Sequence, residues 1–333
     1  MGTSKITPAE FIPHRVFRGG HAQTLASFFL PRRIELSAPE ERYIEVEPGV
    51  SVLCHCHWQP KRRSALTVLI VHGLEGSSDS QYMLGLSAKG CAAGMNVIRM
   101  NQRNCGGTDG LSPTLYHSGR SQDVAAVARN LIDRDDIERF ALVGFSMGGN
   151  LVLKTAGEWG MDGPHQFATV AAVCPSLDLA ASADALHLPF NRIYELYFIW
   201  KLRRRFLAKA RLFPEKFDSN RVRGITSLRD FDDKITAYYS GFDGATDYYA
   251  RAAAANVIDR IAVPALILHA ANDPFIRITE ESRQKINANP HIDFMETIDG
   301  GHCSFLANPD GDDGRWAEQK VMSFLQQIST PLP

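Results

Sequence analysis

The sequence lacks any apolar run long enough to cross a membrane. The longest, Ala65–Val71, is far shorter than the ~20 residues of a transmembrane helix. The first residues, Met1–Phe11, contain no apolar stretch of the kind that a signal peptide needs. Neither sign of charge dominates, because 36 Lys and Arg face 37 Asp and Glu, for a formal net charge of −1. Such a balance argues against a polyanionic partner. We therefore expect a soluble, cytoplasmic protein that binds no nucleic acid.

Cysteines are few and scattered. The six are Cys54, Cys56, Cys91, Cys105, Cys174 and Cys303. Cys54 and Cys56 flank a histidine, but no second Cys/His cluster completes four ligands at a zinc spacing. Alternation along Ser51–Trp58 places both thiols on one face of a strand. We interpret the cysteines as small buried apolar residues of a reduced protein and expect no metal.

The sequence has instead the pattern of an α/β protein. Hydrophobic residues make up 44% and charged residues 22%, as in ordinary globular domains. We expect buried strands at Ala65–Val71, Asn96–Met100, Arg139–Val143, Ala168–Cys174, Val263–His269 and His291–Met295. Helices are expected at Ser80–Ala93, Ser121–Arg134, Met147–Trp159, Thr279–Asn287 and Gly314–Gln327. This alternation predicts a mostly parallel sheet covered by helices on both faces, preceded by a hairpin of Glu41–Glu47 and Ser51–Trp58.

Two segments depart from the alternation. Residues 1–33 mix prolines, a glycine pair and a short apolar stretch, and we expect an N-terminal arm packed on the body. Residues 176–245 form a long excursion between two strands, which predicts a helical cap inserted over the edge of the sheet. The α/β core would then comprise residues 34–175 and 246–333.

The motif Gly144–Gly148 (GFSMG) has the G-x-S-x-G spacing of a nucleophile elbow. It lies between a predicted strand and a predicted helix, the context that this turn requires. Its small residues permit a strained backbone that lifts the Ser146 hydroxyl clear of the sheet. We expect Ser146 to be a catalytic nucleophile; an inert serine in a glycine-rich turn is the alternative.

A serine nucleophile needs a base and an acid, expected in the chain order Ser, Asp or Glu, His. His302 follows the last predicted strand in a glycine-rich loop and is the expected base. Asp273 follows the strand Val263–His269 and is the expected acid, which orients and stabilises the imidazolium. The rival acids are Asp299, on the same loop as His302, and Asp243 and Asp247, at the cap boundary.

Acyl transfer also needs two N–H donors for the oxyanion. The backbone N–H of Met147, directly after the nucleophile, is one candidate. Leu74 is the other, because Gly73 lets the loop after the Ala65–Val71 strand turn this N–H toward the elbow. His72, in the same loop, is expected to be a structural hydrogen-bonding residue rather than a second base.

The ordered set of motifs resembles the α/β-hydrolase superfamily, and more narrowly the AB hydrolase 4 family of the YheT and ABHD1–3 type. The matching segments are His21–Thr24, His72–Ser78, Tyr82, Asn101–Gly107, Tyr116–Gly119, Asp123, Gly144–Asn150, Asp247–Tyr249, Asn272–Pro274 and Gly300–His302. The resemblance implies a Ser–Asp–His ester hydrolase and assigns the triad to Ser146, Asp273 and His302. One departure is Asn104, where the family usually has glycine; asparagine tolerates the left-handed backbone.

The centre of the cap is aromatic and strongly basic. Its basic residues are Arg192, Lys201, Arg203, Arg204, Arg205, Lys209, Arg211 and Lys216, against Glu195 and Glu215. One interpretation is a lid that lines an acyl pocket, with Tyr194 and Phe198 as candidate substrate-binding residues, and that touches anionic lipid headgroups. The favoured interpretation is a helix with one face packed on the body and a solvated basic face.

These observations predict a serine carboxylesterase that acts through an acyl-enzyme on apolar or lipid-like esters. No metal or organic cofactor is needed for this chemistry. Acyl transfer or thioester hydrolysis on the same acyl-enzyme is the alternative enzymatic function. A non-catalytic ligand-binding protein on the hydrolase fold is the alternative outside enzymes. The oligomeric state and the physiological substrate stay open.

Overall fold

The computed structural model describes residues 7–8 and 11–329. Residues 1–6, 9–10 and 330–333, which include part of the predicted N-terminal arm and the end of the predicted core, lie outside the described residues. Among the helices that the structure describes, none combines the length and apolarity needed to span a bilayer.

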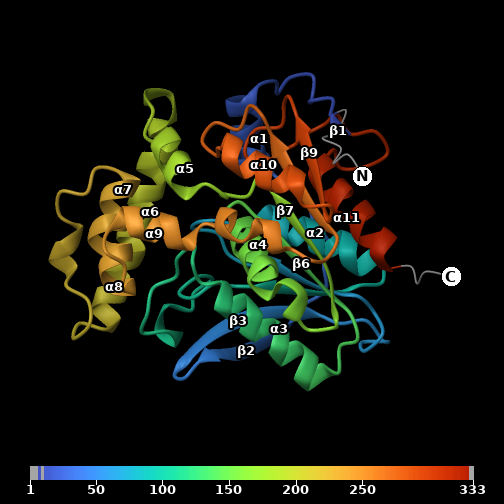
Figure 1. The fold of residues 1–333 in the computed structure, drawn as a ribbon, viewed down its shortest axis with the longest axis horizontal. Coiled ribbons are helices and arrows are strands. Elements are labelled where there is room, and N and C mark those ends of the chain that lie inside the picture. The colour runs from blue at the N-terminus through green and yellow to red at the C-terminus, as the bar shows by residue number, and fades with distance from the viewer. Residues whose placement is uncertain (1–6, 9–10, 330–333) are drawn as a thin grey trace.

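A mixed sheet forms the centre of the molecule (Figure 1). The strand order is β1-β9-β8-β7-β6-β4-β5-β3-β2. The first seven strands in this order run parallel to one another, whereas β3 is antiparallel to both β5 and β2. The strands are β1 (Thr7–Pro8), β2 (Glu40–Glu47), β3 (Val50–His57), β4 (Thr67–Val71), β5 (Asn96–Met100), β6 (Phe140–Phe145), β7 (Phe167–Val173), β8 (Ala265–Ala270) and β9 (Ile292–Thr297). The predicted hairpin and buried parallel strands are confirmed.

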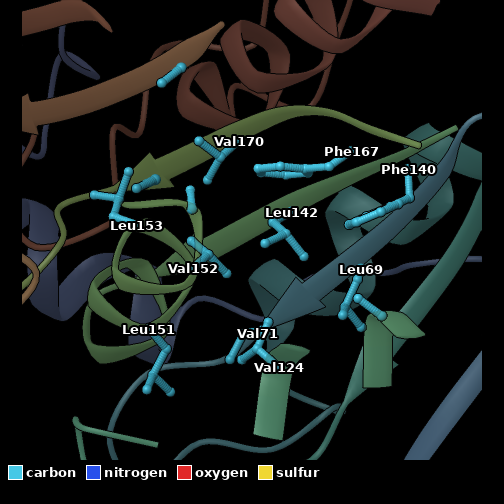
Figure 2. Packing of buried hydrophobic residues seen from close by; sticks show 14 of the residues in the cluster. Leu69, Val71, Val124, Phe140, Leu142, Leu151, Val152, Leu153, Phe167 and Val170 are labelled. Carbon is cyan, nitrogen blue, oxygen red and sulfur yellow. The ribbon is translucent and has the colours of Figure 1, made fainter. Parts of the chain in front are cut away.

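Helices cover both faces of this sheet. On one face are α3 (Ser121–Asp135), α4 (Met147–Trp159) and α10 (Glu280–Ala288); on the other are α2 (Gln81–Ala92) and α11 (Trp316–Ser329). Alternate strand residues serve the two faces: Leu69 packs with the first set and Ile70 with the second. Figure 2 shows the first cluster, where Leu142 lies beside Leu69 and Val170. A strand buried on both faces therefore reads as a continuous apolar run.

Residues between β7 and β8 form helices that stand to one side of the sheet (Figure 1, left). These helices are α5 (Leu179–Leu186), α6 (Arg192–Leu212), α7 (Leu228–Phe231), α8 (Tyr238–Ser240) and α9 (Ala245–Ala252). Single-turn elements are η1 (Asp109–Leu111), η2 (Gly160–Asp162), η3 (Pro189–Asn191), η4 (Ser219–Val222), η5 (Asp232–Ala237, a π-helix), η6 (Ala254–Asn256) and η7 (Ile258–Arg260). The division into arm, core and cap at the stated residue numbers stays a prediction.

The segment before the hairpin contains order that the sequence pattern did not reveal. The strand β1 pairs in parallel with β9, and α1 (Gly20–Phe29) packs against the loop that follows β9. The Gln23 side chain is fully buried, donates to the Leu306 carbonyl at 2.9 Å and accepts from the Leu306 N–H at 2.7 Å. The N-terminal helix is thus tied to the C-terminal part of the chain.

Candidate active site

Ser146 occupies the sharp turn between β6 and α4. Its backbone has φ 54° and ψ −121°, a conformation that costs a non-glycine residue free energy and is typical of a nucleophile elbow. The turn is secured by the Ser146 N–H, which donates to the Val173 carbonyl at 2.9 Å. The hydroxyl lies at the N-terminal end of α4, where the helix dipole favours developing negative charge.

Close packing around the elbow requires glycine. A Cβ on Gly144 would lie 2.2 Å from the Gly148 carbonyl oxygen, and one on Gly148 would lie 2.2 Å from the Val71 carbonyl oxygen. Both contacts are with backbone atoms, which cannot move aside without displacing α4 or β4. Gly144 and Gly148 therefore allow α4 to pack closely against β4 and β6.

Three side chains form a hydrogen-bonded chain at the elbow. The Oγ of Ser146 lies 3.0 Å from Nε2 of His302, and Nδ1 of His302 lies 2.7 Å from Oδ2 of Asp273. The second oxygen of Asp273 accepts from the backbone N–H groups of Phe275 and Ile276, at 3.1 and 2.9 Å. The carboxylate is thus held from both sides, and the imidazole is aimed at the serine.

Electrostatics within this chain favour an imidazolium–carboxylate pair. Burial by itself lowers the pKa of His302, but the adjacent Cys303 and Asp273 raise this pKa well above its ordinary value. Burial by itself raises the pKa of Asp273, and the attraction and hydrogen bond of His302 outweigh it, so the pKa of this carboxyl is lowered. The pair is therefore suited to stabilise a proton that arrives on His302.

The rival acids lie elsewhere. Asp299 accepts from the N–H of Gly19 at 3.0 Å and from the side-chain amide of Asn272 at 2.6 Å, so it braces the loop rather than the imidazole. Asp247 is paired with Arg251 at 2.9 Å and accepts from the N–H of Asp243. Only Asp273, among these four predicted candidates, contacts His302.

The two expected oxyanion donors flank the serine. Leu74 and Met147 both line the cavity into which Ser146 opens. Within the described residues, neither backbone N–H has a hydrogen-bond acceptor. Gly73 packs against the serine so closely that a Cβ there would lie 3.0 Å from that of Ser146. The arrangement leaves two N–H groups beside the nucleophile for a ligand.

His72 braces the loop instead of acting as a second base. Its Nδ1 contacts the Gly73 carbonyl at 2.8 Å, and its Nε2 accepts from the Gln102 N–H at 3.1 Å. Burial lowers the pKa of this histidine to about 4. The Tyr82 hydroxyl, which accepts from the Gly73 N–H at 3.0 Å, completes the support.

Helix α1 contributes contacts that sequence reasoning missed. The Thr24 hydroxyl accepts from the backbone N–H of His302 at 2.9 Å, and the Ser27 hydroxyl lies 2.7 Å from that of Ser304. At the helix start, a Cβ on Gly20 would lie 1.9 Å from the Asn272 carbonyl oxygen. The motif His21–Thr24 had signalled only a family resemblance, because nothing local shows that its partner is 278 residues away.

A mostly apolar cavity of about 120 Å³ lies between the elbow and the helices after β7. Phe198 lies on its wall, together with Leu179, Ala183, Leu186, Leu202, Phe206, Leu228, Phe231, Phe275 and Ile276. Tyr194, the other candidate substrate-binding residue, is placed outside this lining. Its hydroxyl lies 3.0 Å from Nδ1 of His21, and its ring packs on Phe275. Tyr194 thus joins α1 to the cap.

A cluster of two thiols adjoins His302. The Sγ of Cys303 lies 3.9 Å from Nε2 of His302 and 3.4 Å from the Val173 carbonyl, and the ligand atoms of Cys174, His302 and Cys303 lie within 4.8 Å of one another. Burial raises the pKa of Cys174 well above its ordinary value, which disfavours the thiolate that a metal needs. A metal held here would also take His302 away from Ser146, so the cluster does not fit a metal that assists the triad.

Comparison with known proteins agrees with this architecture. The family model described as "alpha/beta hydrolase fold" matches residues 67–309. The chain belongs to the α/β hydrolase fold family. It is 30% identical to "Putative esterase YheT" of Escherichia coli over 95% of this chain and 93% of that protein. It is 28% identical to "Phospholipase ABHD3" of Mus musculus over 76% of this chain and 60% of that protein. The resemblance to the YheT and ABHD type is confirmed.

Solved structures of α/β hydrolases share the fold. Est1E from Butyrivibrio proteoclasticus aligns with a TM-score of 0.55 at 15% identity, over 88% of this chain and 99% of that chain. The Pyrococcus furiosus esterase Pf2001 aligns with a TM-score of 0.57 at 17% identity, over 90% and 97%. Esterases recur in both comparisons, which supports the expected class of carboxylic ester hydrolase.

Proposed function

We propose that the protein is a serine carboxylesterase in which Ser146, His302 and Asp273 form the catalytic triad. The hydrogen-bonded chain from Ser146 Oγ through His302 to Asp273, at the base of an apolar cavity, carries this proposal. Both links have lengths at which protons move between heteroatoms. The strained backbone of Ser146 adds support, because strain of this kind is kept where a reactive group must be presented.

Acylation begins when the Ser146 oxygen attacks the ester carbonyl carbon while its proton passes to Nε2 of His302. The carbonyl oxygen becomes an oxyanion, which accepts hydrogen bonds from the N–H groups of Leu74 and Met147. Asp273 stabilises the imidazolium without taking the proton itself. When the carbon–oxygen bond to the alcohol breaks, His302 returns the proton to the leaving oxygen, and an acyl-serine remains.

Deacylation repeats these steps with water. His302 takes a proton from a water molecule, whose oxygen attacks the acyl carbon of the acyl-serine. The second tetrahedral intermediate collapses, the proton returns from His302 to the Ser146 oxygen, and the carboxylic acid is released.

The cavity favours an apolar acyl group. Aliphatic and aromatic side chains from α5, α6 and α7 line one side of it, and Leu74, Met147, Phe275 and Ile276 add further apolar surface. An apolar cavity of about 150 Å³ holds a benzene molecule, so about 120 Å³ accommodates a short acyl chain with the cap in this position. Relatives named "Phospholipase ABHD3" and "Monoacylglycerol lipase" support glycerolipid-like esters as the substrate class.

Hydrolysis of p-nitrophenyl esters, from acetate to palmitate, tests the proposal. The wild type is expected to favour short and medium chains, and Ser146→Ala is expected to lose turnover on every member while it keeps its fold. Circular dichroism of the variant is the control for folding. Turnover that survives in Ser146→Ala would contradict the assignment of the nucleophile, and folded wild type without any turnover would contradict the esterase.

A further inference from the structure

The solvent side of α6 is unexpectedly apolar. Ile193, Leu196 and Trp200 are 68%, 55% and 52% exposed, and Tyr197 beside them is exposed as well. Their spacing of three and four residues makes one stripe along the helix. The opposite stripe, which contains Ile199, Leu202 and Phe206, is buried in the cap. The first half of α6 is therefore apolar on both sides, which departs from the favoured expectation of a solvated basic face.

The stripe continues onto α1. The ring of Phe28 meets that of Tyr197 edge to face, with centroids 5.7 Å apart. Phe29, next to it, is 73% exposed, and Leu25 is exposed one turn earlier. These seven side chains, Leu25, Phe28, Phe29, Ile193, Leu196, Tyr197 and Trp200, are called the α1–α6 face below. Scattered apolar residues are normal on protein surfaces, but a contiguous patch drawn from two elements marks an interaction site.

Positive charge adjoins this face. Arg204 lies over the Trp200 ring at 4.7 Å, and Arg211 and Lys216 follow as exposed residues toward the end of the segment. Within the described residues, Arg203, Arg204 and Arg211 have no carboxylate oxygen within 4.0 Å of their guanidinium nitrogens. The acids of the segment are Glu195, which is buried against Arg192, and the exposed Glu215. The outward charge beside the apolar stripe is thus mainly positive.

Three other basic residues of α6, namely Lys201, Arg205 and Lys209, point into the protein. Lys201 donates to the Glu75 carbonyl at 2.7 Å, Arg205 pairs with the Glu75 carboxylate at 2.8 Å, and Lys209 donates to Oδ1 of Asn104 at 2.5 Å. The helix therefore separates its cations into a set that anchors it to the core and a set that is left for solvent or a partner.

We propose that the α1–α6 face docks onto a bilayer that contains anionic phospholipid. Aliphatic and phenyl side chains enter the interface, Trp200 and Tyr197 lie at the level of the headgroups, and the arginines meet lipid phosphates. A second copy of this chain fits less well, because a two-fold contact through this face would bring the same positive groups together. Charge complementarity selects the lipid surface.

The purpose of this docking, access to lipid-like esters, rests on the proposed function. The inner side of α6 places Phe198, Leu202 and Phe206 on the wall of the cavity. Helix α1 holds the backbone of His302 through Thr24. Both helices of the face thus also contact the candidate site, so docking of the face would bring the site close to apolar esters dissolved in the bilayer.

Flotation of the full chain with vesicles tests the proposal. The probes are phosphatidylcholine alone and phosphatidylcholine with phosphatidylglycerol. Binding is expected to the mixed vesicles, much less to the neutral ones, and to weaken as salt is added. The triple variant Ile193→Gln, Leu196→Gln, Trp200→Gln is expected to lose at least tenfold in binding. Arg203→Gln with Arg204→Gln is expected to lose about fivefold per residue.

Matched controls lie on other surfaces. Met161→Gln removes an equally exposed apolar side chain, and Arg129→Gln with Arg134→Gln removes two exposed charges from α3. Both controls are expected to bind as the wild type does. The proposal is overturned if the wild type does not float with mixed vesicles, or if the controls lose as much binding as the face variants.

Two further readouts separate the remaining outcomes. Sedimentation without lipid would overturn the proposal if it revealed a dimer that the triple variant abolishes, because the face would then bind a second copy. Hydrolysis of p-nitrophenyl acetate without vesicles is expected to be the same in wild type and face variants. Failure of the esterase would appear in that assay alone, whereas failure of docking would appear in flotation alone.

Discussion

At the scale of single residues, the acid was chosen among several carboxylates, and Asp299, the nearest to His302 in sequence, is not the one that contacts it. Asp273→Asn is expected to lower kcat on the order of 10⁴-fold, because an amide cannot hold the required tautomer or stabilise the imidazolium. The control is Asp299→Asn, which changes a carboxylate that braces the loop through Gly19 and Asn272. Steady-state kinetics on a short-chain ester measure both. The account is wrong about the acid if the two variants lose similar activity.

Thr24 is expected to be a positioning residue for His302. In Thr24→Val the buried N–H of His302 loses its acceptor, and an unsatisfied donor costs about 1–3 kcal/mol. We expect kcat to fall about tenfold or more with little change in KM, since Thr24 is not part of the cavity lining. Thr24→Ser retains the hydroxyl and should restore most of kcat. A merely structural role would instead leave kcat unchanged in both folded variants.

The pH dependence follows from the pKa of His302. Only the neutral imidazole can accept the Ser146 proton, and the pKa of His302 is raised well above its ordinary value of 6.5. Activity should therefore be lost as pH falls, and kcat/KM, which reports the free enzyme, should reach half its plateau above pH 6.5. A pH-stat assay with a short-chain ester measures this directly. A midpoint below pH 6.5 would contradict the proposed electrostatics.

Local sequence explains some residues well and others not at all. Asn104 has φ 64°, the left-handed conformation that asparagine tolerates and that was expected where the family usually has glycine. Its side chain also accepts from Lys209, a contact that no local pattern could show. Ser146, Asp273 and His302 could be predicted from the sequence because each follows a strand at the same edge of a parallel sheet. The role of Thr24 could not be predicted, because its partner is distant in sequence.

At the scale of elements, α6 is fastened to the loop after β4 by a buried acid. Glu75 accepts from Arg205 at 2.8 Å and from the Tyr116 hydroxyl at 2.6 Å, and its carbonyl accepts from Lys201. The same loop carries Leu74, an expected oxyanion donor. The positions of α6 and of the loop that carries Leu74 are therefore linked through Glu75.

Removal of that charge should weaken the protein measurably. Glu75→Gln leaves the largely buried guanidinium of Arg205 with only the more distant carboxylate of Asp109, at 3.9 Å, and breaking such a buried pair costs about 3 kcal/mol. Urea denaturation measures the free energy of unfolding. Arg204→Gln, which removes an exposed guanidinium from the same helix, is the control and should change this free energy by less than about 0.5 kcal/mol. Equal stability of Glu75→Gln and wild type would rule out the fastening role.

The pattern of α6 shows where element-level prediction stops. The sequence shows eight basic residues from Asn191 to Lys216, but it does not show in which direction each side chain points. Which cations turn inward depends on the acceptors that other elements present, such as the Glu75 carbonyl and the Asn104 side chain. The apolar stripe of Ile193, Leu196 and Trp200 was readable as helical spacing, but its exposure was not, because burial is a tertiary property.

At the scale of the whole molecule, alternation of strands and helices predicted the class of fold and nearly every parallel strand. It could not give the order of the strands, which depends on how each crossover connection runs. The pairing of β1 with β9 escaped prediction because two residues, Thr7–Pro8, carry no periodic signal. The contact of Gln23 with Leu306, which joins the N-terminal and C-terminal parts of the chain, was also not predicted, because the two residues are far apart in the sequence.

Covalent labelling by a small fluorophosphonate tests the central claim most directly, because it depends on an activated serine and not on the correct substrate. The account predicts one phosphonyl group per chain, found by mass spectrometry on the peptide that contains Ser146. Ser146→Ala should stay unlabelled, and His302→Ala should react far more slowly. Labelling at another residue, or equal labelling of wild type and Ser146→Ala, would contradict the account.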